Sequence, residues 1–198
     1  YNIPIDEIPN TVLGLGAVPF SQVANLFKEA EDATLGGGAT VDTTQTDDSG
    51  DSVLLDAQGD FLTGTGDYVH YQLTDVLNKL PEGRYLLFVR AKDSAQVTDD
   101  FRFYVRNTTD NRYLNEENEK VTRTLTDSFA YYGVVFDLTD DDSGDTVSFV
   151  AEKATTTTNG IWVDYFLIIS ISNGESWPQD LAHNALRTYD KRYKVYRR

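Results

Sequence analysis

The chain has 198 residues, of which 40% are hydrophobic and 25% charged, with no cysteine and a formal net charge of −15 at pH 7. This length corresponds to one domain with extensions, and 12 Tyr and 10 Phe are enough for a sizeable core. The absence of cysteine excludes disulfides, thiolate metal sites and a cysteine nucleophile. The strong negative charge argues against nucleic-acid binding by the body of the chain. The sequence contains no run of 18 apolar residues, so we expect no membrane span.

The acidic residues are mostly Asp and occur with many Thr, a composition typical of halophiles, where molar salt screens self-repulsion. An ordinary acidic secreted protein is the alternative. The charge is uneven, because residues 185–198 carry a net +5 and the remaining residues −20. The basic side chains of this tail are Arg187, Lys191, Arg192, Lys194, Arg197 and Arg198. Such a tail either docks onto the acidic surface of a neighbouring copy or is a solvated terminus.

Residues 1–26 do not have the pattern of paired strands. Pro4, Pro9 and Pro19 divide this segment into short apolar pieces, and each proline removes a backbone donor that a central strand needs. We therefore expect an extended N-terminal arm that lies on its own domain or on a neighbouring subunit.

Residues 27–172 predict an all-β domain, an antiparallel β-sandwich. Short strands separated by polar turns are typical of sandwiches, and we expect about nine of them. Residues 36–52 read as a long loop of Gly, Thr and Asp. The expected strands after it are 53–55, 67–73, 84–91, 101–105, 123–125, 130–138, 146–152 and 161–171. In residues 67–73 alternate side chains are apolar, which marks a half-buried strand.

Residues 173–198 predict a C-terminal arm. Ser176 and Gln179 can cap a helix that begins near Pro178, and a short amphipathic helix is expected over about 178–188. Its apolar face, with Trp177, Leu181 and Leu186, needs a partner surface. We assign these residues and the basic tail to assembly.

Four blocks of the sequence carry a resemblance to a known family, and they are FKEAE at 27–31, GDYVHY at 66–71, PEGRYLLFVR at 81–90 and GIWVDYF at 160–166. They resemble blocks of the calcium-containing carbohydrate-binding modules that have the galactose-binding-like jelly-roll fold. They follow the order of that family and together cover about 27–172. The resemblance implies that the first and last strands of the sandwich lie side by side.

The same resemblance implies a structural Ca²⁺ between these two strands, with Glu29 or Glu31, or both, and Asp164 as its side-chain ligands. Independently, Ca²⁺ takes six to eight oxygen ligands, and two carboxylates on one strand beside a third supply most of the charge. The alternative is that these residues are exposed charges on an edge strand. The Asp-rich runs at 47–51 and 140–145 lack the spacing of an EF-hand and are expected to be solvated loops.

The sugar site of that family matches less well. The family places an Asn just before the closing Asp, where this chain has Trp162, while Asn159 lies three residues earlier. Strict alternation would put Trp162, Asp164 and Phe166 on one face of the last strand. Asn159 and Trp162 are the candidate glycan ligands, and core packing is the alternative for Trp162.

No nucleophile elbow, phosphate-binding Gly loop or zinc spacing is present, so we expect no enzyme. Arms at both ends favour an assembly role, and the closing segment is similar to the ends of jelly-roll proteins in tailed-virus virions. The predicted function is a virion structural protein (tail, baseplate or capsid decoration) of a tailed virus of a halophile. Its partners would be copies of itself, other virion proteins and a host glycan. The alternative is a secreted or cell-surface carbohydrate-binding module, for example of a glycoside hydrolase.

Overall fold

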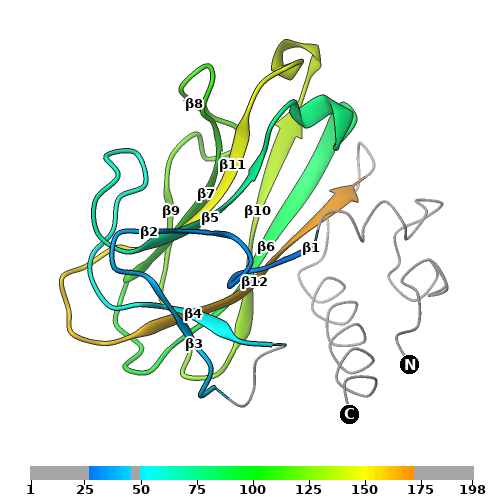
Figure 1. Cartoon of the computed structure of the whole chain (residues 1–198). Coiled ribbons are helices and arrows are strands. Elements are labelled where there is room, and N and C mark those ends of the chain that lie inside the picture. The colour runs from blue at the N-terminus through cyan, green and yellow to red at the C-terminus, as the bar shows by residue number, and fades with distance from the viewer. Residues whose placement is uncertain (1–26, 46–49, 172–198) are drawn as a thin grey trace, which may run out of the picture.

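The computed structural model describes residues 27–45 and 50–171, which form two antiparallel β-sheets packed face to face (Figure 1). Each sheet has six strands, and the described residues contain two short 3-10 helices, Val76–Asn78 and Asp140–Asp142. The predicted all-β sandwich is confirmed. No helix in this part of the chain is long and apolar enough to cross a membrane.

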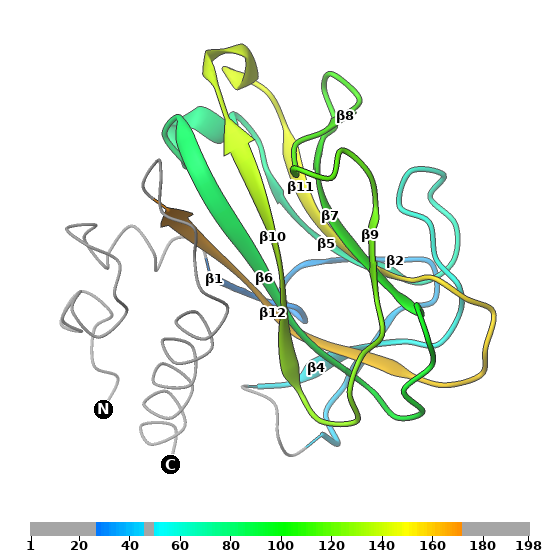
Figure 2. The same ribbon diagram turned by 180° about the vertical axis from the view of Figure 1, so that it is seen from behind.

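The first sheet is organised around β12, the closing strand of the sandwich. Its strand order is β10-β6-β12-β4-β3, and β1 pairs with β12 on the same side as β4. The strands are β1 (Phe27–Glu29), β3 (Thr40–Asp42), β4 (Ser52–Leu55), β6 (Gly83–Asp93), β10 (Ala130–Leu138) and β12 (Ile161–Ile171). The two longest, β6 and β12, pair along their whole length. Figure 2 shows β10, β6 and β12 side by side.

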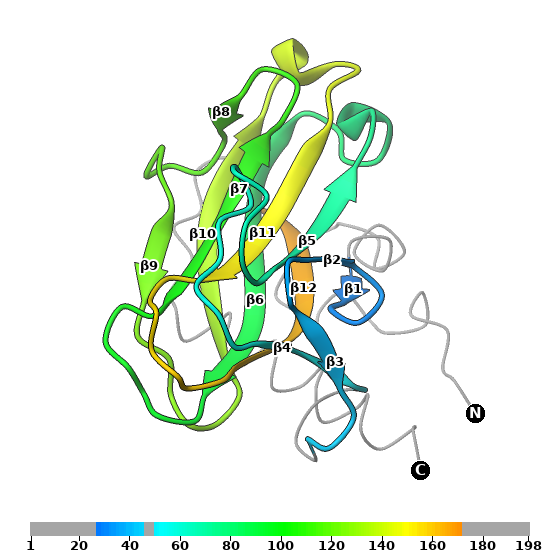
Figure 3. The same ribbon diagram turned by 60° about the vertical axis from the view of Figure 1, so that its left-hand side comes forward.

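The second sheet has β11 at its centre, between β5 and β7 (Figure 3). Its order is β2-β5-β11-β7-β8, and β9 pairs with β7. The strands are β2 (Thr34–Gly36), β5 (Tyr68–Leu73), β7 (Phe101–Asn107), β8 (Arg112–Tyr113), β9 (Val121–Arg123) and β11 (Val147–Lys153). The alternation predicted for β5 is confirmed, since Val69 and Leu73 belong to the core.

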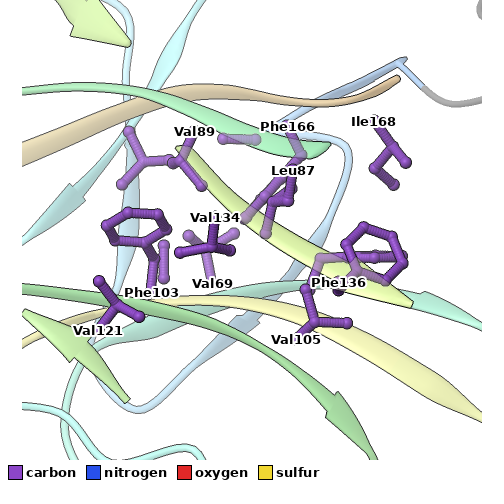
Figure 4. Packing of buried hydrophobic residues seen from close by; sticks show 14 of the residues in the cluster. Val69, Leu87, Val89, Phe103, Val105, Val121, Val134, Phe136, Phe166 and Ile168 are labelled. Carbon is purple, nitrogen blue, oxygen red and sulfur yellow. The ribbon is translucent and has the colours of Figure 1, made fainter. Parts of the chain in front are cut away.

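The core lies between the sheets and is made of alternate side chains from both (Figure 4). Phe103 and Phe149 of the second sheet and Phe136 and Phe166 of the first are fully buried there. Burying a side chain of this size stabilises the fold by about 1.5–3 kcal/mol. Such a core makes the sandwich rigid enough to hold the residues at its surface in fixed positions.

The structure has twelve strands in the described residues, more than the nine that the sequence predicted. The missed strands, β2, β3 and β8, are two or three residues long and lie at or near sheet edges. So short a segment cannot show a period of two. β3 lies inside the stretch 36–52 that we expected to be a loop, and β9 ends two residues earlier than predicted.

Candidate functional site

The predicted closure of the first strand on the last is confirmed. β1 pairs antiparallel with β12, with Phe27 opposite Leu167 and Glu29 opposite Tyr165. The backbone N–H of Ala30 donates to the carbonyl of Asp164 at 2.8 Å. Asp164 stands where β12 changes its partner from β4 to β1, and the register with β6 shifts there. The shift is a β-bulge, which redirects the side chains that follow it.

Asp164 carries a cationic partner from the neighbouring strand. Its carboxylate accepts a hydrogen bond from Arg90 of β6 and forms an ion pair with it, and the two side chains are 0% and 5% exposed. The guanidinium of Arg90 also lies 4.7 Å from the ring centroid of Phe129 and 5.8 Å from that of Tyr165. A buried carboxylate needs such compensation, because an unpaired charge in this position is strongly destabilising.

Glu31 is the second carboxylate near this position, and it is incompletely compensated. Its Oε2 atom is buried without a hydrogen-bond partner, while Oε1 accepts from the backbone N–H of Asp51 at 3.3 Å. Burial raises the pKa of the Glu31 carboxyl above its usual value, and the charges of Asp164 and Asp32 raise it further. This is the environment in which a carboxylate gains most from a nearby cation.

These features fit a cation held by Glu31 and Asp164, and they do not bring Glu29 to the same point. Glu29 is buried opposite Tyr165. In residues 27–45 and 50–171, no group of three or more acidic or histidine side chains is placed to hold a metal ion. Any further oxygen ligands would have to come from the backbone or from water. The three-residue metal set remains a prediction.

The strict alternation expected for β12 is wrong. The bulge at Asp164 moves Phe166 to the core side, with Ile161 and Val163, while Tyr165 lies outside the core cluster. Inserting one residue reverses the facing of every residue after it. Trp162 therefore stays on the outer face of the first sheet, away from the core.

Trp162 lies in a half-buried patch with aromatic, cationic and acidic groups. Its Nε1–H donates to Asp42 at 2.7 Å, and the ammonium of Lys92 lies 5.5 Å from its ring centroid. The same ammonium lies 4.6 Å from the ring centroid of Phe129. A hydrogen bond from the hydroxyl of Thr44, with others from its backbone and from Trp162, lowers the pKa of Asp42. We call Trp162, Lys92, Phe129 and Asp42 the tryptophan patch.

Asn159 has a different environment from Trp162. Its amide donates to Asp93 at 2.7 Å and to Asp100 at 2.8 Å, and both carboxylates are buried. The Asn159 carbonyl accepts from the buried ammonium of Lys153. Asn159 thus links the loops after β6 and β11, and among the described residues its amide shares no hydrogen-bond partner with Trp162.

The outer face of the second sheet holds one further buried carboxylate, Glu152. It is paired with Lys120 at 2.7 Å and Arg102 at 3.0 Å, and it accepts from the hydroxyl of Tyr104 at 3.1 Å. The N–H of Phe61 adds a fourth bond at 3.0 Å. A carboxylate with both oxygens occupied in this way stabilises the fold and is poorly suited to accept a substrate proton.

Sequence reasoning missed Arg90, Lys92, Phe129 and Asp42. One signal was available for Arg90, because an arginine within an otherwise apolar strand needs a partner. The other three come together only because β3 pairs with β4, β4 and β6 pair with β12, and β10, which Phe129 precedes, pairs with β6. No local pattern encodes these pairings. The assembly residues Trp177, Leu181, Leu186, Arg187, Lys191, Arg192, Lys194, Arg197 and Arg198 lie outside the described residues, as do both predicted arms.

No family model matches the chain, and no curated protein matches it. A family 35 carbohydrate binding module from Clostridium thermocellum is 18% identical, with a TM-score of 0.50, and the match covers 73% of this chain and 97% of that one. An isomalto-dextranase from Arthrobacter globiformis T6, complexed with panose, is 15% identical with a TM-score of 0.52, covering 72% and 22%. A module named CBM36, in complex with calcium and xylotriose, is 16% identical with a TM-score of 0.46, covering 72% and 98%. At these identities the likeness shows the fold, a sandwich of the type found in carbohydrate-binding modules.

Proposed function

We propose that the sandwich is a non-catalytic carbohydrate-binding domain that holds a glycan at the tryptophan patch. The observation that carries this proposal is the placement of Lys92 between the rings of Trp162 and Phe129, with Asp42 beside them. A sugar ring offers C–H groups on its faces and hydroxyls at its edge. Aromatic rings flanked by a few fixed polar groups suit such a ligand. The likeness in fold to a carbohydrate-binding module supports the same function.

The polar groups of the patch have complementary roles. Asp42 fixes the ring of Trp162 by accepting from its Nε1–H, and hydrogen bonds from Thr44 and Gln45 hold the carboxylate in place. The ammonium of Lys92 can donate to hydroxyl oxygens while it stays in contact with both rings. The patch itself supplies no paired acid and base at the spacing that glycoside hydrolysis requires, which favours binding without cleavage.

The test is titration calorimetry of the full chain with xylotriose and with panose, the sugars bound to two of the similar structures. We expect Trp162→Ala to weaken binding more than tenfold and Trp162→Phe, which keeps a ring, to weaken it less. Leu62→Ala serves as the control, because Leu62 is exposed on a loop beside the second sheet. Binding that is unchanged in Trp162→Ala would exclude the patch. Failure of the wild-type chain to bind these and a wider set of oligosaccharides would exclude the function.

We also propose that Ca²⁺ binds between β1 and β12, with Glu31 and Asp164 as side-chain ligands and a structural role. The buried, unpartnered oxygen of Glu31 supports this assignment. An ion there would neutralise the carboxylate of Glu31, whereas Arg90 pairs with that of Asp164. Thermal unfolding in Ca²⁺ and in chelator tests it, and the midpoint should rise with Ca²⁺ in the wild type but not in Glu31→Gln. An equal midpoint in both buffers would rule the ion out.

Assembly into a particle is the second candidate function. It rests on the two terminal arms that the sequence predicts, which lie outside the described residues. A virion of a tailed virus infecting a halophile, as predicted from the sequence, stays a prediction. Sedimentation of the full chain in molar salt would decide between these functions, since a monomer that binds sugar contradicts assembly and a closed oligomer supports it.

A further inference from the structure

The tryptophan patch belongs to a row of side chains that crosses the first sheet from strand to strand. Thr40 of β3 lies opposite Leu54 of β4, and Leu54 lies opposite Trp162 of β12. Trp162 in turn lies opposite Lys92 of β6. The register of β10 with β6, continued by one residue, places Phe129 opposite Lys92, whose ammonium lies 4.6 Å from its ring centroid. We call Thr40, Leu54, Trp162, Lys92 and Phe129 the cross-strand strip.

The strip lies on the outer face of the sheet. The residues directly before and after Leu54 and Trp162 all belong to the core cluster, so Leu54 and Trp162 themselves point away from it. Lys92 follows the core residue Ala91 and points outward for the same reason. Thr40 is exposed, and the other four members are half-buried. The strip is therefore a surface feature of the sandwich.

The indole of Trp162 lies along the strip. Its Nε1–H donates to Asp42 at 2.7 Å, and Asp42 belongs to β3, two strands away from β12. Since neighbouring strands are about 4.8 Å apart, the ring has to lean across β4 to reach this carboxylate. Gly160 leaves room for this, because a Cβ there would lie 2.8 Å from the side chain of Leu54 and 3.0 Å from the indole. The ring thus extends in the direction that crosses the strands.

The length and ends of the strip indicate the size of its ligand. Four inter-strand spacings of about 4.8 Å give about 19 Å, the length of an extended tetrasaccharide. The strip begins on β3 and ends at the start of β10, the first and last strands in the order of this sheet. Figure 1 shows β3, β4 and the beginning of β12 side by side at one end of it. A site that runs from edge to edge suits a segment within a longer chain, which can leave on both sides.

The side chains of the strip suit a linear polysaccharide. The rings of Trp162 and Phe129 offer apolar surfaces to the faces of two sugar units. Lys92 lies between these rings, and among the residues 27–45 and 50–171 its ammonium has ring contacts but no ion pair. Its N–H donors are therefore available to sugar oxygens, and the hydroxyl of Thr40 can donate or accept at the far end.

We propose that the cross-strand strip binds the interior of a linear polysaccharide, whose chain runs across the strands from β3 to β10 with Trp162 beneath its middle. This inference rests on the proposed function and deepens it, because it gives the ligand a direction and a length of about four sugar units. A site for a single terminal sugar would use Trp162 and its direct neighbours and would gain nothing from Thr40 or Phe129.

Titration calorimetry of the full chain with xylo- and isomalto-oligosaccharides, from the disaccharide to the hexasaccharide, tests the proposal. In the series that binds, we expect the dissociation constant to fall at least tenfold from the disaccharide to the tetrasaccharide and to change little beyond it. An affinity that is already complete at the disaccharide would overturn the strip and leave a glycan site at Trp162 standing. If no length of these or of a wider set of series binds, both proposals are overturned.

Variants at the two ends of the strip test its direction. Phe129→Ala and Thr40→Val should each weaken binding of the tetrasaccharide by about three- to tenfold. Disaccharide binding should stay within about twofold, which also reports that Trp162 and the fold are intact. Val41→Ala is the matched control, because Val41 is 42% exposed next to Thr40 but lies opposite the core residue Val53, on the other face of β3. Tetrasaccharide binding that is unchanged in both end variants, or that falls equally for both lengths, would overturn the proposal.

Discussion

The ion pair between Arg90 and Asp164 offers the strongest test of the site. Replacement of Arg90 by Met keeps an unbranched side chain of similar reach and removes its charge. The carboxylate of Asp164, which is fully buried, then loses this cationic partner. Breaking a buried pair in this way costs about 3–5 kcal/mol. For a domain of this size the thermal midpoint should fall by roughly 6–20 °C, at about 2–4 °C per kcal/mol.

The assay is denaturant unfolding in chelator, followed by circular dichroism, for Arg90→Met, Asp164→Asn and the double variant. If the loss in Arg90→Met comes from removing the cationic partner of the buried Asp164 carboxylate, Asp164→Asn added to it should restore stability, so the two changes will not be additive. Arg84→Met on the same strand is the matched control. Its pairs with Glu116 and Asp137 are partly exposed, and their loss should cost no more than about 1 kcal/mol. If Arg90→Met lowered the free energy of unfolding by less than about 1 kcal/mol, or if the double variant did not recover stability, the reasoning would be refuted.

Three other substitutions have definite expected outcomes. Burial raises the pKa of the Glu31 carboxyl, so the contribution of this group to stability is present below its unfolded-state pKa and is lost as pH rises through its folded-state pKa. Glu31→Gln should remove this loss and stabilise the fold by about 1 kcal/mol near neutral pH, measured by denaturant unfolding in chelator at a series of pH values. Gly66→Ala should cost about 1–3 kcal/mol more than Gly64→Ala, because both glycines have positive φ but only at Gly66 would a Cβ lie 1.8 Å from a backbone oxygen. Lys153→Met should cost about 3 kcal/mol in urea unfolding, since the buried ammonium donates to three backbone carbonyls.

Much of the fold could be predicted because it is encoded locally. The bounds of β10 and β12 follow from apolar runs that end at polar turns, and both were predicted to the residue. The motif Gly66-Asp67 has a clear structural basis. Gly66 adopts φ +60° against a neighbouring backbone, and the buried carboxylate of Asp67 accepts from the N–H groups of Gly38, Asp56 and Ala57. These are constraints on single residues, and a sequence shows them directly.

The candidate site was only partly predictable because its geometry depends on pairing between distant strands. Arg90 and Asp164 are 74 residues apart, and Asp42 and Trp162 are 120 apart. The resemblance placed Asp164 opposite the first strand correctly. It gave no indication that an arginine from β6 would neutralise this carboxylate. Asn159 was grouped with Trp162 as a ligand, whereas its amide is held between Asp93 and Asp100.

The bulge at Asp164 connects the two main features of this face. Without it, Tyr165, Leu167 and Ile169 would point into the core, and Phe166 and Ile168 would point outward. With it, β12 keeps apolar side chains on both faces of the first sheet. The same extra residue places a carboxylate at the junction of β1, β4 and β6, where a cation is required. A single local irregularity in the closing strand therefore creates both the charged junction and the apolar outer face of β12, and this joint origin explains why neither follows from a strict period of two.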